Sequence, residues 1–253
     1  MMHLDSARQL LEKEIIRRNN KQELTAEKPD PLLVASQYRN ETVALVCALF
    51  AYGNAGQIVK FLHTLDFSLL SEDDTHIKEV LSNRYYRFQN SGDVASLFIA
   101  LKRIKEIDTI ENIFYKGYKK ENNILEGLWG FIDVLNSVYT RDTQGYRFLV
   151  GKIPQKLTGA GIGTYKRYMM YLRWMVRDDN LDLGLWSKID KKDLLMPLDT
   201  HTFKVSRTLG LLKRKTYDMK ASIELTEQFK KWDENDPIKY DFALYRLGQE
   251  KII

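Results

Sequence analysis

The sequence predicts an all-α protein, and three observations lead to that fold class. Apolar residues recur at helical spacing along most of the chain. Alternating runs of Val, Ile and Thr bounded by turns, which are typical of strands, do not occur. Only five prolines interrupt the 253 residues, and several segments begin with a helix-capping residue. From this spacing we expect about eleven helices.

The composition places the chain among soluble globular proteins, because 44% of the residues are hydrophobic and 29% are charged. No apolar run approaches the roughly 18 residues that a membrane span needs. The first 20 residues are charged and amphipathic, unlike a signal peptide. The single cysteine, Cys47, excludes an internal disulfide and an iron–sulfur cluster held by several cysteines. We therefore expect a cytoplasmic protein without a metal site.

Positive charge is concentrated in one region of the chain. Residues 151–215 contain 14 Lys and Arg but only six Asp, a net charge of +8, so the remaining residues sum to −3. A basic region on a slightly acidic protein indicates a polyanionic partner. A solvated, lysine-rich surface is the alternative.

The first half of the chain predicts several helices in succession. The first begins near Ser6, and Asp30-Pro31 starts the second, because proline fits the first helical position. Residues 41–52 are almost uniformly apolar and predict a buried helix. Gly53-Asn54 ends it, and another helix follows from Gln57. Tyr52, Asn54 and Gln57 form either a pocket wall or a plain turn.

Later helices are punctuated by capping residues. Ser91 or Asp93 caps the next helix, and further helices are expected at 109–118 and 124–140. Residues 71–90 and 141–156 show little periodicity and predict connections. Near the end, Thr216 caps a helix that runs to Lys231, and Asp236-Pro237 starts a helix that Gly248 ends.

A glycine-rich turn, LTGAGIGTYK, precedes a basic helix. Gly159, Gly161 and Gly163 leave backbone N–H groups open, and Thr164 can cap the helix that follows. Open N–H groups at the positive end of a helix bind phosphate. The turn has neither the G-K-[ST] of a Walker loop nor the G-x-G-x-x-G that follows a strand in dinucleotide-binding folds.

The basic helix carries its cations along one line. Lys166, Arg173 and Arg177 are 7 and 4 residues apart, which at about 100° per residue puts them on one face. Most other positions are apolar, so this cationic stripe reaches a partner or a cleft, or it is the wet edge of a buried helix. Lys166 lies in the first turn, where the helix dipole favours a neutral, nucleophilic amine. A phosphate contact or a plain surface lysine is the alternative.

An isolated aspartate follows in PLDTHTFKV. Pro197 stops any preceding helix, and Asp199 is placed to cap the helix that contains Phe203 and Val205. Capping is the simple role for Asp199. His201 has no ligand-like neighbour in the sequence and is expected to be structural.

These segments resemble the helix–hairpin–helix DNA glycosylase superfamily. Residues 198–205, LDTHTFKV, match its L/V-D-T-H-x-x-[RK]-V segment, and Leu157-x-Gly159-x-Gly161 is similar to its hairpin. Overall the chain looks like a bacterial family related to that superfamily. The segments that carry this likeness are LFAYGNAGQI, YKRYMMYLRWMVR, LDLGLW, PLDTHTFKVSRTLGL and DPIKYDFALYRLG, which span most of residues 30–248.

The resemblance implies two helical lobes around a central cleft: residues 40–165, ending in the hairpin, and residues 1–39 with 166–253. It implies a monomeric, nucleoid-associated enzyme that binds duplex DNA and flips the target base into a pocket. No cofactor is implied, although a monovalent cation at the hairpin fits the family. The implied phosphate contacts are Gly159, Gly161, Gly163, Thr164, Arg167 and Arg177.

One departure from the superfamily pattern affects the catalytic lysine. The usual lysine position, two after the second hairpin glycine, is Gly163, and Lys166 lies three residues later. The wide spacing to Asp199 resembles the archaeal 8-oxoguanine glycosylase branch, which implies Lys166 and Asp199 as catalytic residues. The same likeness implies a base pocket formed by Asp241, Tyr245, Arg173, Asn54 and Gln57.

Three functions are compatible with these patterns. The first is a base-excision repair glycosylase, with or without AP lyase activity, on an oxidised purine. The second is a non-catalytic DNA- or RNA-binding protein on the same scaffold, which Gly163 favours. The third is a helical protein-interaction scaffold with an incidental basic face.

Overall fold

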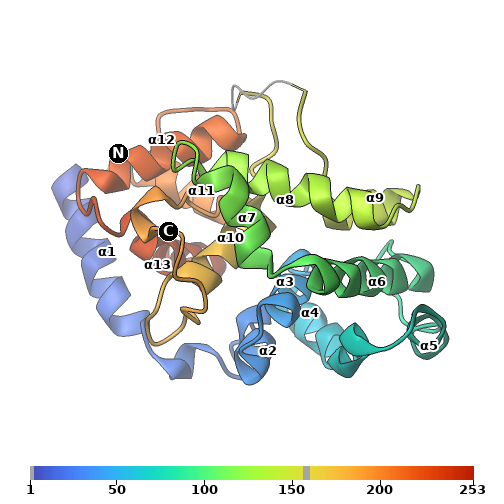
Figure 1. Ribbon diagram of the computed structural model, residues 1–253. Coiled ribbons are helices and arrows are strands. Elements are labelled where there is room, and N and C mark those ends of the chain that lie inside the picture. The colour runs from blue at the N-terminus through green and yellow to red at the C-terminus, as the bar shows by residue number, and fades with distance from the viewer. Residues whose placement is uncertain (1–2, 156–159) are drawn as a thin grey trace. The chain divides into compact units, whose positions relative to one another are not determined.

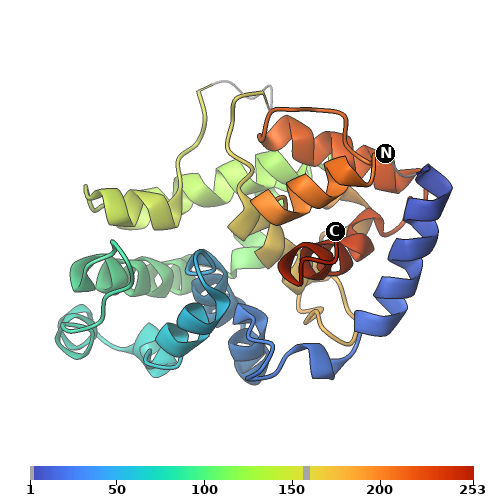
Figure 2. The same cartoon turned by 180° about the vertical axis from the view of Figure 1, so that it is seen from behind.

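The computed structural model describes residues 3–155 and 160–253, and within them the chain forms thirteen α-helices and no strand. Figures 1 and 2 show these helices as coiled ribbons. Two isolated bridges, Tyr86 with Gln89 and Asp178 with Leu183, are the only β-type pairings among these residues. The predicted all-α class is therefore confirmed. No helix in the described ranges is long and apolar enough to cross a membrane.

The chain divides into two compact units. Unit 1 combines Met1–Glu23 with Pro154–Ile253, and unit 2 is Leu24–Ile153. The boundaries differ from the expected ones at 39/40 and 165/166. Residues 24–39 belong to unit 2 because α2 packs on α3 and α4. The described part of the glycine turn belongs to unit 1, where Gly161 and Ile162 are hydrogen-bonded to residues 218 and 219.

Unit 2 contains eight helices: α2 (Pro31–Tyr38), α3 (Glu41–Leu49), α4 (Ala55–Leu62), α5 (Asp74–Val80), α6 (Ser91–Ile107), α7 (Ile110–Tyr118), α8 (Ile124–Val138) and α9 (Gln144–Val150). Asp30 caps α2 as expected, since its carboxylate accepts the N–H of Leu32 at 2.9 Å. The predicted burial of α3 is confirmed from Thr42 to Leu49. The buried Cys47 lies in this helix, and burial raises the pKa of its thiol.

Two details of unit 2 differ from the expectations. Asn90, rather than Ser91, caps α6, in a reciprocal capping box with Asp93. Helices α5 and α9 lie in stretches predicted to be connections. Each has only seven residues, about two turns, which is too short for an apolar periodicity to stand out.

Unit 1 contains five helices: α1 (Leu4–Arg18), α10 (Lys166–Val176), α11 (Thr200–Thr208), α12 (Met219–Lys230) and α13 (Asp241–Gln249). The blue α1 packs against α13, and α11 packs against α13 as well (Figures 1 and 2). Gly248 lies inside α13 instead of ending it. A Cβ at Gly248 would approach His201 Cβ to 3.1 Å, so the glycine permits the close approach of α11.

A buried ion cluster joins α1 to the end of α13. The side chain of Arg18 is 1% exposed. Its Nε donates to Glu14 at 2.6 Å, and its two terminal nitrogens each donate to Glu250 at 2.8 Å. Arg246 donates to the carbonyl oxygen of Glu23 at 2.6 Å. Each buried charge therefore faces an opposite charge.

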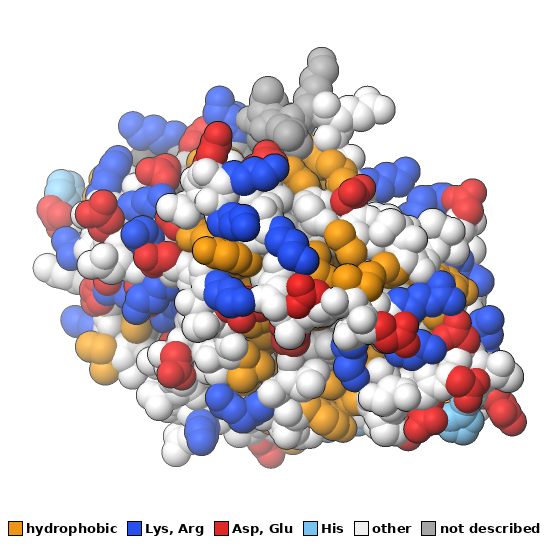
Figure 3. Space-filling view, viewed as in Figure 1, with side chains coloured by type: hydrophobic (Ala, Val, Ile, Leu, Met, Phe, Trp, Pro, Cys, Tyr) orange, Lys and Arg blue, Asp and Glu red, His pale blue; other side chains and the backbone are white. Residues whose placement is uncertain are grey.

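The surface does not carry one sign of charge throughout. On the face in Figure 3, Lys and Arg side chains are interspersed with Asp and Glu side chains, and hydrophobic groups are exposed among them.

Candidate functional site

The candidate site is built in unit 1 around the start of α10. Tyr165 occupies the N-cap position with φ 46° and ψ 34°, a left-handed conformation, and provides no side-chain cap. The predicted cap, Thr164, is buried and one residue too early to cap the helix. Lys166 is the first residue of α10 and is half-buried. Its ammonium group forms no hydrogen bond or ion pair with residues 3–155 or 160–253.

The turn before α10 is bound to the segment before α12. Gly161 donates its N–H to the Asp218 carboxylate at 3.0 Å, and Met219 donates its N–H to the carbonyl of Ile162 at 2.9 Å. Asp218, not the predicted Thr216, caps α12 by accepting the N–H of Ala221.

The charge of Asp218 is strongly stabilised. Arg214 contacts it through Nε at 2.8 Å and a terminal nitrogen at 2.5 Å. This contact, together with the N–H groups of Gly161 and Ala221, lowers the pKa of Asp218 to about 2.

These contacts correct the expected phosphate site at the glycines. The N–H of Gly161 is already bound to an internal carboxylate, so a phosphate would have to displace Asp218 to reach it. Gly163 is exposed, with open space where a Cβ would stand. Gly159 lies outside the described residues. Arg167 is half-buried at the start of α10.

Asp199 is the N-cap of α11, and its Oδ1 accepts the N–H of Thr202 at 2.8 Å. The simple capping role is therefore confirmed. Its other oxygen accepts no hydrogen bond from the described residues. The half-buried side chain thus keeps one carboxylate oxygen available for a ligand.

Asp241 connects the candidate residues electrostatically. It is 4% exposed at the start of α13, and Arg173 contacts its carboxylate at 2.5 Å. Burial raises the pKa of Asp241 to about 6, Arg173 opposes the rise, and the negative charge of Asp199 adds to it. The positive charge of Lys166 lowers the same pKa. Lys166, Asp199 and Arg173 therefore each lie within interaction range of the Asp241 charge.

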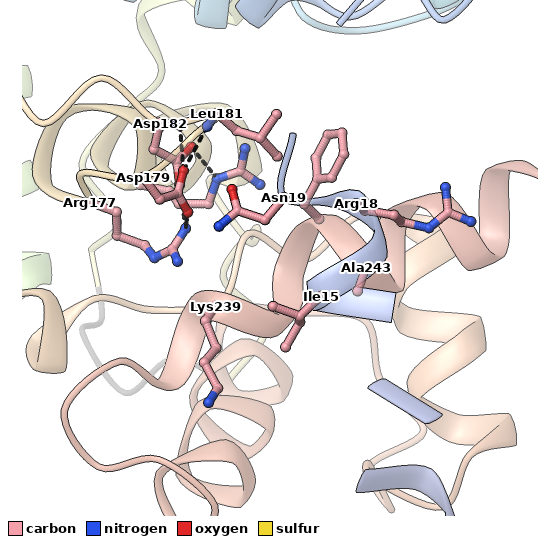
Figure 4. A pocket seen from close by; sticks show the side chains of 11 residues that line it. Ile15, Arg18, Asn19, Arg177, Asp179, Leu181, Asp182, Lys239 and Ala243 are labelled. Carbon is pink, nitrogen blue, oxygen red and sulfur yellow. Dashed lines mark hydrogen bonds and ion pairs between the residues drawn. The ribbon is translucent and has the colours of Figure 1, made fainter. Parts of the chain in front are cut away.

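The other cations of the α10 stripe are neutralised inside unit 1. Arg173 Nε donates to Asp182 at 3.0 Å. Arg177 contacts Asp182, Asp179 at 3.0 Å and Asp236 at 3.0 Å. Figure 4 shows the Asp179 carboxylate facing Arg177. The expectation that Arg177 binds DNA phosphate is therefore not supported, since three carboxylates already surround its guanidinium.

A small cavity lies beside this ion network. Its volume is about 20 Å³, enough for one water molecule. It is lined by Ile15, Arg18, Asn19, Arg173, Arg177, Asp179, Leu181, Asp182, Lys239, Phe242 and Ala243 (Figure 4). A nucleobase does not fit this cavity, so the cavity is not a base pocket. Its lining residues support Arg173 instead.

The remaining candidate pocket residues fall in different places. Tyr245 is half-buried on α13, with its ring 6.2 Å from that of Phe242. Asn54 and Gln57 belong to unit 2, where Asn54 caps α4 by accepting the N–H of Gln57 at 3.2 Å. The plain turn is confirmed there, because Gly53 has a φ of 100°. Within residues 3–155 and 160–253, no three His, Cys, Asp or Glu side chains are grouped as metal ligands.

Several residues that organise this site were not expected from the sequence. Asp182 binds both Arg173 and Arg177, and the acidic run DDNLD directly after Arg177 is the signal for it. Asp218 and Tyr217 hold the turn before Lys166, and no local pattern marks them, because their partners lie 53 or more residues away.

Sequence comparisons assign the chain to a family. Curated proteins and solved structures give no match. The family described as "Protein of unknown function (DUF2400)" matches residues 30–250, which is most of the chain and includes α2 to α13. The protein therefore belongs to the DUF2400 family.

Proposed function

We propose that the protein is a DNA base-excision glycosylase that acts on an oxidised purine such as 8-oxoguanine, with Lys166 adding AP lyase activity. The observation that carries the proposal is the placement of Lys166 at the first position of α10 and of Asp199 at the N-cap of α11, with the charges of both acting on Asp241. Within residues 3–155 and 160–253, the Lys166 ammonium forms no hydrogen bond or ion pair, and one Asp199 oxygen accepts no hydrogen bond. The likeness of residues 198–205 to the glycosylase segment supports the same function.

Each residue has a defined role in the proposed reaction. As the N-glycosidic bond breaks, its electron pair leaves with the base, and the open oxygen of Asp199 stabilises the positive charge that develops on the sugar. The Lys166 ammonium first gives up a proton to water, and the resulting amine then donates its lone pair to the anomeric carbon. Loss of a proton and opening of the sugar ring give an imine, from which β-elimination cleaves the 3′ phosphate ester.

The partner and setting follow from the same proposal. The substrate is duplex DNA with a flipped base, bound by a monomer at the bacterial nucleoid. The described chemistry needs no cofactor, because the amine and the carboxylate perform both steps. Phosphate contacts come from cations other than Arg173 and Arg177, whose charges are neutralised internally.

Borohydride trapping tests the proposal. Incubation with an 8-oxoguanine duplex and borohydride reduces the imine to a stable amine, and we expect a covalent protein–DNA complex. Lys166→Gln should lose this complex, and Asp199→Asn should lose base release. Lys231→Gln, which removes the same charge from an exposed position of unit 1, is the matched control. A wild-type protein that neither releases nor traps any base from a broad lesion panel would refute the glycosylase function.

One observation favours non-catalytic DNA binding instead. The N–H of Gly161 is bound to Asp218, and Gly163 replaces the usual lysine, so the hairpin departs from the catalytic pattern. Duplex binding that weakens steeply with salt, without base release, would support this second function. Absence of DNA binding even at low salt would support a protein-interaction scaffold.

A further inference from the structure

Tyr217 contacts the segments that carry both candidate catalytic residues. Its hydroxyl oxygen lies 3.3 Å from Thr164 Oγ1, two residues before Lys166. The same hydroxyl donates to the carbonyl oxygen of Leu198 at 2.8 Å, one residue before Asp199. One phenol group therefore joins the start of α10 to the start of α11.

The direction of these hydrogen bonds follows from the single hydroxyl proton of Tyr217. A phenol has one proton, and Tyr217 uses it to reach the Leu198 carbonyl, which can only accept. Thr164 must then donate its proton to the Tyr217 oxygen. The result is a directed chain from Thr164 through Tyr217 to Leu198.

The ring of Tyr217 is also held in place. It packs edge-on against Phe203 of α11, with ring centroids 5.5 Å apart. Burial raises the pKa of the Tyr217 hydroxyl, Thr164 opposes this rise, and the charge of Asp199 adds to it. The phenol therefore stays protonated near neutral pH and keeps its donor bond.

The residues that follow Tyr217 bind the turn before α10 but not the start of α11. Asp218 and Met219 bind Gly161 and Ile162, so they hold the turn before α10. Among the residues that the structure describes, the Asp199 carboxylate accepts a hydrogen bond only from Thr202 of α11. Tyr217 is thus the residue of this segment whose side chain reaches both helix starts.

We propose that Tyr217 is a positioning residue that sets the separation between the Lys166 amine and the Asp199 carboxylate. The inference rests on the proposed glycosylase function for its kinetic consequence. The structural link can be measured without any activity. Catalytic groups that must converge on one sugar lose rate steeply when their separation changes.

Hydrogen exchange tests the link independently of function. Tyr217→Phe keeps the ring and removes the hydroxyl, and we expect faster amide exchange in both segments 160–168 and 197–205. Thr164→Val removes only the first bond and should speed exchange in 160–168 alone. Tyr85→Phe, at an exposed position of unit 2, is the control. Equal exchange in Tyr217→Phe and the control would overturn the proposal.

Kinetics separate positioning from a general loss of structure. With an 8-oxoguanine duplex, Tyr217→Phe should lower kcat about tenfold while KM stays within about twofold. Faster exchange throughout unit 1, or a rise in KM at unchanged kcat, would contradict a positioning role. If the wild type is inactive, the proposed glycosylase function fails, whereas the exchange experiment still decides whether Tyr217 couples the two segments.

Discussion

Arg173 and Asp241 form a buried ion pair between α10 and α13, with 2.5 Å between the guanidinium nitrogen and the carboxylate oxygen. The charges of Lys166 and Asp199 both act on Asp241. Asp241 was expected to contact a base. Arg173 contacts Oδ2 of its buried carboxylate, so a base contact would have to use Oδ1.

The raised pKa of Asp241 predicts a specific dependence of stability on pH. The folded protein holds the Asp241 proton up to about pH 6, whereas the unfolded chain releases it near 3.8. The stability that this proton contributes is present below pH 3.8 and is lost as pH rises through 6. Asp241→Asn mimics the protonated form and lacks this loss.

We therefore expect the unfolding free energy of Asp241→Asn, relative to wild type, to increase by on the order of 2 to 3 kcal/mol between pH 4 and 7. Urea unfolding at several pH values measures the difference. A difference that stays constant over this range would show that Asp241 titrates normally.

The lowered pKa of Asp218 predicts the opposite dependence of stability on pH. Its folded pKa of about 2 lies below the ordinary 3.8, so its contribution is present above pH 3.8 and is lost as pH falls through 2. Asp218→Asn should lower the free energy of unfolding by about 2 kcal/mol at pH 7, and this loss should become smaller in acid. Thermal unfolding at pH 7 and pH 2.5 compares the two proteins. An equal cost at both pH values would assign the effect to lost packing instead of lost charge.

Gly248 predicts a steric effect at the contact between α11 and α13. Gly248→Ala places a methyl group 3.0 Å from Val205 Cγ2 and 3.1 Å from His201 Cβ. We expect destabilisation of about 1 to 3 kcal/mol, because α11 must move away. Gly130→Ala in α8, where the nearest atom is 4.0 Å away, should be neutral or stabilising. Denaturant midpoints measure both variants, and equal midpoints would show that α11 yields without cost.

The buried position of Arg18 predicts a large loss of stability when its charge is removed. Arg18→Met leaves the buried carboxylate of Glu14 without its nearest cation and removes one of the two arginines beside Glu23, which costs roughly 3 to 5 kcal/mol. Arg17→Met removes an exposed neighbour with the same charge and should cost less than about 1 kcal/mol. Chemical unfolding compares the two. Similar costs would mean that the buried cluster does not stabilise the fold.

The all-α fold class could be predicted from local patterns, whereas the N-cap residues could be predicted from them only in part. Asp30 and Asp199 cap the predicted helices, and the carboxylate of each accepts a backbone N–H of the first turn. Near Thr216, two capping residues compete. Asp218 is selected because Arg214 and Gly161 also bind its carboxylate, and the contact with Gly161 spans 57 residues.

The candidate site was predicted only in part for the same reason. Lys166 and Asp199 are marked by their positions at helix starts, and the charges of both act on Asp241. Arg177 looked available because its helix face is cationic. It is neutralised by Asp179 and Asp182 in the acidic run that follows it, and by Asp236, which lies 59 residues away, beyond any local pattern. Local and long-range ion pairs together decide which cations of this stripe remain open.

Unit 1 combines an N-terminal segment with a C-terminal one, and this arrangement has a consequence for synthesis. The hydrogen bonds between Arg18 and Glu250 join residues 232 positions apart. On the ribosome, unit 2 is complete before α13 has been made, so it can fold while α1 still lacks its partner. During that interval α1 is a short, isolated helix that is only marginally stable in water. Folding of unit 1 therefore waits for the last helix, and a nascent chain stalled before Asp241 would expose the apolar face of α1 to chaperones.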